Sequence, residues 1–77
     1  MKFREAVDRL MDEYMQAGAT KEEAFVLCTC VTAAFINNVP RDVDGSLATL
    51  RKAQSIFRDT YGRSSPFIDA AMKERLQ

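Results

Sequence analysis

The feature that most constrains this sequence is a run without any charged residue, from Ala24 to Pro40. Charged side chains make up 29% of the 77 residues, so this run stands apart from the rest of the chain. A surface helix needs only one apolar stripe, whereas a helix that is apolar on most sides has to be covered on most sides. The run is also shorter than the roughly 20 predominantly apolar residues that cross a bilayer. It therefore predicts a core or interface helix and no membrane span.

Local signals place the ends of this helix and of a short helix near the C-terminus. Residues 20–23, Thr-Lys-Glu-Glu, have the capping-box pattern, so we expect the apolar helix at about 21–37. Ser65 precedes Pro66, which is favoured in the first turn of a helix. A short last helix is therefore expected to begin at this point, with an apolar stripe of Phe67 or Ile68, Ala71 or Met72, and Leu76.

Apolar residues at spacings of three and four predict two further helices. The first ends at Gly18, and the other begins near Asp44 or Ser46 and ends at Gly62. No segment alternates as a strand would. We predict an all-α fold, a compact bundle of about four short helices around the central apolar helix, in one domain over residues 1–77. The two stripes are Phe3, Val7, Leu10 and Tyr14 with Met11 and Met15, and Leu47, Leu50, Ala53, Phe57 and Tyr61.

On a helical wheel the apolar helix carries two separate stripes, although one stripe is enough for packing against a core. Either the other three helices cover both stripes, or the second one packs against another copy of the chain or another protein. Small residues in the middle of the second stripe would allow a close approach. The first stripe is Leu27, Val31 and Phe35 with Ala24, Cys28 and Ala34; the second is Phe25, Thr29, Thr32 and Ile36; Val26, Cys30 and Ala33 lie between them.

Cys28 and Cys30 in this helix raise the question of a metal or redox site. Residues two apart on an α-helix of 3.6 residues per turn point about 200° apart, so the two thiols can neither bridge each other nor share a metal. A zinc site needs further ligands, and the chain has no histidine and no third cysteine. Free cysteine packs as a small hydrophobe. We expect both cysteines in the core, with no metal and no other cofactor.

The predicted third helix carries a basic strip, which we define as Arg51, Lys52, Ser55 and Arg58. None of its three cations has an acidic residue three or four positions away, whereas the first helix offers pairs such as Arg4–Asp8. The strip is either a solvated surface or, helped by Arg41 or Arg63, a site for phosphate, nucleic acid or an acidic protein. A formal net charge of zero, from eleven basic and eleven acidic residues, argues against general attraction to nucleic acid.

Together these features favour a small, non-enzymatic protein–protein interaction module, an adaptor, inhibitor or regulator. A chain of this length buries only about 60% of its unfolded surface, so a second subunit is a natural supplement to its stability. We expect a cytoplasmic homo-oligomer, a dimer, that also binds another protein. A nucleotide- or nucleic-acid-binding role for the basic strip is the alternative. The carboxylates are expected on exposed faces or at caps, which does not favour catalysis.

Overall fold

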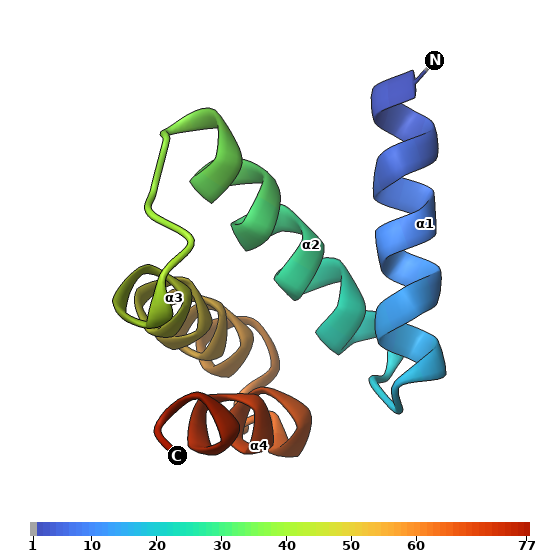
Figure 1. Ribbon diagram of the computed structural model, residues 1–77. Helices are drawn as coiled ribbons and strands as arrows, with labels where there is room; N and C mark the ends of the chain where they lie inside the picture. Colours follow the sequence, from blue (N-terminus) through green and yellow to red (C-terminus); the bar gives the residue numbers. More distant parts are fainter. Residues whose placement is uncertain (1) are drawn as a thin grey trace.

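The computed structural model describes residues 2–77, which form four α-helices and no strand. These are α1 (Lys2–Gln16), α2 (Lys21–Ile36), α3 (Val43–Tyr61) and α4 (Pro66–Arg75). Each helix packs mainly on its neighbours in the sequence, α1 on α2, α2 on α3, and α3 on α4 (Figure 1). The predicted all-α bundle is confirmed.

The caps of α2 and α4 lie where the sequence predicted them. In the capping box of α2, the Thr20 N–H donates to Glu23 Oε1 at 2.8 Å and the Glu23 N–H donates to Thr20 Oγ1 at 3.2 Å. At α4 the Ile68 N–H donates to Ser65 Oγ at 3.0 Å, and Pro66 occupies the first turn. These bonds satisfy amide groups that have no partner within the helix, which fixes where each helix begins.

Helix α3 begins earlier than predicted, at Val43, because Asp42 is its N-cap and accepts a bond from the Gly45 N–H at 2.9 Å. The backbone of Gly45 lies directly against the backbone of Pro40, in the loop before the helix. A Cβ atom at position 45 would overlap the carbonyl oxygen of Pro40, so only glycine fits. At the other end Gly62 adopts the left-handed conformation with φ of 70°, which confirms the predicted stop.

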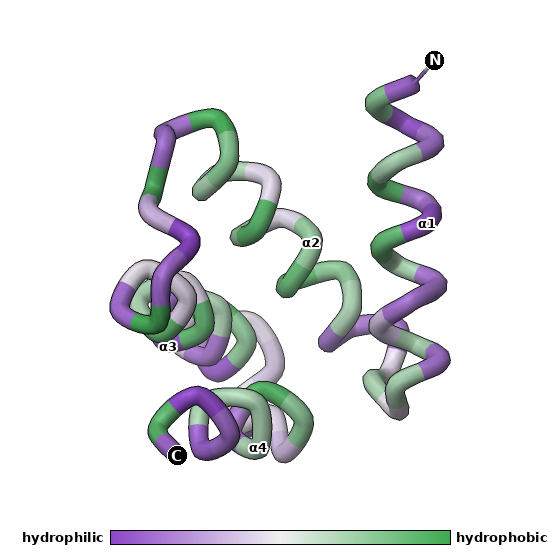
Figure 2. Tube along the Cα trace, viewed as in Figure 1, coloured by the Kyte–Doolittle hydropathy of each residue, from purple (hydrophilic) through white to green (hydrophobic). Residues whose placement is uncertain are grey.

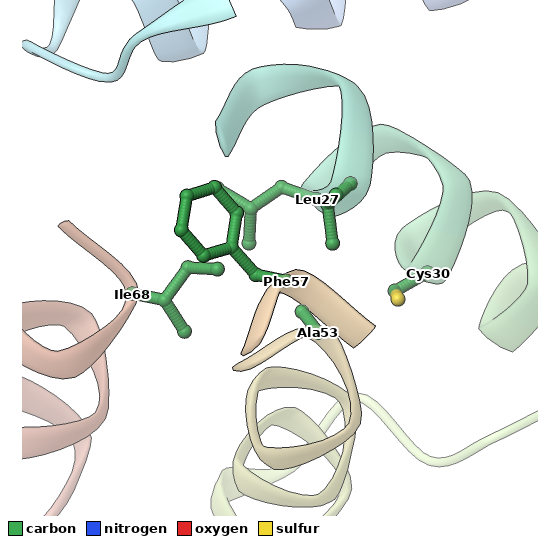
Figure 3. Close-up of a cluster of buried hydrophobic side chains, with 6 residues drawn as sticks. Leu27, Cys30, Ala53, Phe57 and Ile68 are labelled. Carbon is green, nitrogen blue, oxygen red and sulfur yellow. The ribbon is translucent and has the colours of Figure 1, made fainter. Parts of the chain in front are cut away.

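The centre of the core lies between α2, α3 and α4. Figure 3 shows the Phe57 ring between Leu27 of α2 and Ile68 of α4, and all three side chains are buried. Val26 and Cys30, which lie between the two stripes of α2 on the helical wheel, belong to this core. The face of α2 that meets α3 is centred on these two residues, one turn apart. Cys28 is also buried, and neither thiol is bridged, as predicted.

Helix α1 is less well covered than its apolar stripe predicted, because no side chain in it is fully buried. Val7, Leu10 and Tyr14 are half-buried, and Phe3 is 61% exposed. Figure 1 shows the reason: α1 and α2 are close near the connecting loop and diverge toward the N-terminus of α1. Figure 2 shows hydrophobic positions repeating along α1 between hydrophilic ones, also in the N-terminal part of α1 that lies away from α2.

Four other residues predicted as members of helix stripes are exposed: Met15 at 44%, Tyr61 at 39%, Phe35 and Leu76. Phe35 of α2 is 65% exposed, because it lies near the end of α2 that α1 does not reach. Leu76 is 67% exposed and follows the last residue of α4, where no other helix packs. The ion pairs predicted along α1, such as Arg4–Asp8, are not formed. Across residues 2–77 the one ion pair within 4 Å joins Lys73 and Asp69, at 3.5 Å.

Candidate protein-interaction surfaces

The second stripe of α2, called the outer stripe from here on, consists of Phe25, Thr29, Thr32 and Ile36. Phe25 is 62% exposed and Ile36 is 66% exposed, while Thr32 between them is half-buried. The Thr29 hydroxyl donates to the carbonyl oxygen of Phe25 at 2.9 Å, so its hydrogen bond is made within the helix. Within a single chain the other three helices do not cover this stripe, which leaves two large apolar side chains in solvent.

The buried side of α2 explains why the outer stripe is left free. Ala24, Leu27 and Cys28 are buried on the sides that meet α1 and the core, as the first stripe predicted. Val26 and Cys30 are buried against α3. With 3.6 residues per turn, these positions occupy somewhat more than half of the helix circumference, and the outer stripe occupies the remainder. Helix α2 therefore has one face that its own chain does not use.

The basic strip lies on the solvent side of α3. Arg51, Ser55 and Arg58 are exposed, and their spacing of four and three places them on one side of the helix. No acidic group lies within ion-pair distance of these cations in the part of the chain that is described. Lys52 borders a small recess of about 140 Å³ together with Cys30 of α2. Burial raises the pKa of the Cys30 thiol, and the positive charge of Lys52 offsets only part of that rise.

The two arginines expected to support the basic strip each lie over an aromatic ring. The guanidinium carbon of Arg41 is 5.1 Å from the centre of the Phe35 ring. That of Arg63 is 5.1 Å from the centre of the Phe57 ring. Cation–π contacts of this kind hold a guanidinium in place. Arg41 of the α2–α3 loop is therefore held by the exposed Phe35, and Arg63 is held by the buried Phe57.

A groove between the helices was not predicted. It has a volume of about 780 Å³ and takes lining residues from all four helices and from the α2–α3 loop. Figure 1 shows how α2, α4 and the lower end of α1, which contribute to this lining, lie relative to one another. The apolar lining residues were predicted as members of separate helix stripes, and a stripe on one helix does not show which residues of other helices it faces, so the groove could not be seen from the sequence. Its apolar wall is Val31, Ala34, Phe35, Leu50, Phe67 and Ala71.

A second unpredicted feature is a buried polar cluster, here called the polar clamp, of Glu23, Gln54 and Ser65. Ser65 Oγ donates a short hydrogen bond to Glu23 Oε2. The Ser65 N–H donates to Gln54 Oε1 at 2.8 Å, and Gln54 Nε2 donates to the Ser65 carbonyl oxygen at 2.9 Å. The three residues are 4% exposed or less. The clamp joins α2, α3 and the start of α4, and its members are fully satisfied, which marks it as structural.

Titration of the clamp depends on Glu23. Burial alone would raise the pKa of this carboxyl, but hydrogen bonds from Ser65, from Thr20 and from the Phe67 N–H outweigh it, so the pKa is lowered. The carboxylate is therefore the stable form at neutral pH. Burial raises the pKa of both the Cys28 and the Cys30 thiol, which keeps them protonated and poorly nucleophilic.

Residues 2–77 contain no group of three or more His, Cys, Asp or Glu side chains placed to hold a metal ion. None of the four helices combines the length and the apolar character that crossing a membrane requires. Comparisons with protein-family models, with curated proteins and with solved structures each gave no match. The candidate surfaces are therefore the outer stripe, the basic strip and the groove, and their roles have to be argued from their chemistry.

Proposed function

We propose that this chain is a non-enzymatic interaction module that acts by binding protein, and that it assembles with a second copy through the outer stripe. The observation that supports the proposal is the uncovered face of α2, where Phe25 and Ile36 are each more than 60% exposed. Monomeric proteins rarely leave a contiguous apolar patch of more than a few hundred Å² in water. Large anchors at both ends of a row of smaller residues suit a helix–helix contact.

The size of the exposed apolar surface fits an interface. An aromatic side chain buries about 150–250 Å² when it is fully covered, so the exposed parts of Phe25 and Ile36 together supply on the order of 200 Å². A standard interface takes about 800 Å² from each partner. The outer stripe would therefore supply the apolar centre of such an interface, and the residues around it would supply its polar rim.

Charge favours a second copy over a strongly charged partner. The chain has no net formal charge, so two copies approach without general repulsion. The outer stripe itself contains no charged residue, and a charged partner would find nothing there to pair with. An isologous contact, in which the same face of each copy meets, is the commonest arrangement of small oligomers.

The test is light scattering after size exclusion on the parent and on two variants. We expect a dimer for the parent, a monomer for Thr32→Arg, and a dimer for the control Arg51→Glu. Thr32 lies in the middle of the outer stripe, so arginine there would bring two like charges together, whereas Arg51 lies on α3. A parent that is monomeric at tens of micromolar, or a Thr32→Arg variant that assembles like the parent, would show that the outer stripe is not the contact.

A second candidate function rests on the cations of the basic strip, which have no ion-pair partner in the chain. Arg51 and Arg58 would bind phosphate groups of a nucleotide or nucleic acid. Fluorescence anisotropy of a labelled single-stranded DNA at rising salt tests this, because phosphate-driven binding weakens steeply with salt. Binding at low salt that falls in Arg58→Gln would support the candidate. No binding at low salt would eliminate it.

A further inference from the structure

The outer stripe has large side chains at its two ends and small ones at its centre. Phe25 and Ile36, which are 62% and 66% exposed, lie roughly 16 Å apart along α2, because a helix rises 1.5 Å per residue. Thr29 and Thr32 lie between them, and the midpoint of the two threonines is also the midpoint of Phe25 and Ile36. The stripe therefore has the same order of large and small residues in both directions.

Two copies of such a stripe can meet in two orientations that a twofold axis allows. With parallel helices each residue of the stripe lies opposite its own copy, so Phe25 meets Phe25 and Ile36 meets Ile36. With antiparallel helices Phe25 of each copy meets Ile36 of the other, and Thr29 meets Thr32. In both orientations small residues face small residues, so packing alone does not decide between them.

The charge of Glu22 distinguishes the two orientations. Glu22, Thr29 and Ile36 are spaced by seven positions, or about two turns, so the exposed Glu22 lies on the line of the outer stripe, just beyond its end. Lys21 lies on the line of Cys28, which is buried on the side that meets α1. Parallel helices would therefore bring two Glu22 carboxylates together at one end of the contact, where like charges repel. Antiparallel helices would hold them roughly 25 Å apart, well beyond the distance of about 10 Å at which salt screens exposed charges.

The other end of α2 offers Glu22 a suitable neighbour in the antiparallel orientation. Residues 37–40, Asn-Asn-Val-Pro, follow Ile36 and carry no charge. Asn37 and Asn38 are exposed, and their side-chain amides can donate hydrogen bonds to a carboxylate. Antiparallel helices also set the positive N-terminal end of each helix dipole beside the negative C-terminal end of the other.

We infer that the two copies meet with their α2 helices antiparallel, with Phe25 of each copy against Ile36 of the other and Glu22 beside the turn at Asn37 and Asn38. This inference rests on the proposed self-association through the outer stripe and adds its orientation and residue pairs. The same face is used, so Thr32→Arg disrupts this contact too. The two Thr32 side chains lie on either side of the twofold axis, about 4.5 Å apart along the helices.

Disulfide trapping separates the two orientations. The variants Phe25→Cys and Ile36→Cys are mixed under mild oxidation, and the disulfide dimers are counted by intact mass spectrometry, in which the two variants differ in mass. Both replaced positions are exposed, whereas the native thiols of Cys28 and Cys30 are buried. Antiparallel helices bring the new thiols of unlike variants together and hold those of like variants roughly 16 Å apart, too far for a disulfide. Because a bound partner raises the effective concentration toward millimolar, we expect the mixed dimer to exceed each same-variant dimer by at least about tenfold.

The other outcomes separate this inference from the proposed self-association. If the same-variant dimers exceed the mixed dimer, the antiparallel inference is wrong, and the outer stripe remains the contact with parallel helices. The control variant is Thr60→Cys, at an exposed position on α3. If the dimers form in the ratio of random pairing, and no faster than disulfide dimers of Thr60→Cys, the outer stripe is not the contact, which overturns both the orientation and the proposed self-association.

Discussion

The junction of α2, α3 and α4 and the helix α1 are built from the same kinds of residue but are held very differently. At the junction Phe57 and Ile68 are fully buried, and the polar clamp satisfies every buried side-chain group around them. In α1 no side chain is fully buried, although its apolar stripe is regular. The difference shows that an amphipathic pattern predicts a helix and the face it would bury, while burial itself depends on what the neighbouring helices reach.

The largest expected difference between the two regions is in the cost of removing a phenylalanine. Phe57→Ala should lower the free energy of unfolding by about 3–5 kcal/mol, because it opens a cavity between Leu27 and Ile68. Phe3→Ala, at an exposed position, should change it by less than about 0.5 kcal/mol. Urea unfolding followed by circular dichroism measures both, at a concentration low enough to keep the chain monomeric. Similar costs at the two positions would contradict the distinction between a core and a loosely covered helix.

A smaller effect is expected at the polar clamp. Glu23→Gln leaves one acceptor oxygen where Ser65, Thr20 and Phe67 all donate, so we expect a loss of about 1–3 kcal/mol in unfolding free energy. The neighbouring Glu22→Gln is the control, since Glu22 is exposed and should change stability by less than about 0.5 kcal/mol. Equal effects at positions 22 and 23 would mean that the clamp contributes little.

The clamp also predicts a dependence of stability on pH. The folded pKa of Glu23 is below its ordinary value of 4.5, so its contribution is complete above that value and is lost as pH falls through the folded pKa. Unfolding free energies of the parent and of Glu23→Gln should therefore converge in acid. If the difference in unfolding free energy between the parent and Glu23→Gln stayed constant from neutral pH to below the folded pKa, Glu23 would not be ionised in the folded protein.

The smallest expected effect is a difference between the two cysteines. Burial is the main cause that raises the pKa of Tyr14 of α1, and Cys28 adds more to that rise than Cys30, which lies in the core between α2 and α3. Opening of α1 alone would expose Cys28, and exposure of Cys30 needs the core to open. In single-thiol variants, Cys28 (in Cys30→Ala) should react faster with a thiol reagent than Cys30 (in Cys28→Ala). The reverse order would show that α1 is held as firmly as the core.

Local chemistry made much of the fold predictable from the sequence. Thr20, Ser65 and Gly62 each fix a helix end through bonds to residues within a few positions, and all three were correctly assigned. The start of α3, predicted near Asp44 or Ser46, was placed one to three residues late, because the approach of Gly45 to Pro40 depends on the path of the α2–α3 loop. Phe35 was assigned to the first stripe of α2 because a helical wheel shows on which side of the helix a residue lies. It does not show how far along α2 the contact with α1 extends, and that contact ends before Phe35.

The candidate surfaces were predictable in part. The outer stripe was identified from the sequence because α2 has two apolar stripes. Phe25 and Ile36 are exposed in a single chain. That a partner covers them is the proposal made above. The groove and the polar clamp were missed for one physical reason. Each is made where residues from several helices meet, and Glu23 and Ser65, which share a hydrogen bond, are 42 positions apart.

The neighbour-to-neighbour packing of the helices also bears on how the chain folds. Proteins whose contacts are mostly local in sequence fold fast, in microseconds to milliseconds, because little loop entropy is lost before contacts form. Here each helix is joined to the next by a short loop, so we expect consecutive helices to form helical hairpins early in folding. The bonds of Glu23 with Ser65 and with the Phe67 N–H, 42 and 44 positions apart, close the longest loops among the polar contacts, so we expect them to form late, after the helices that they join have met.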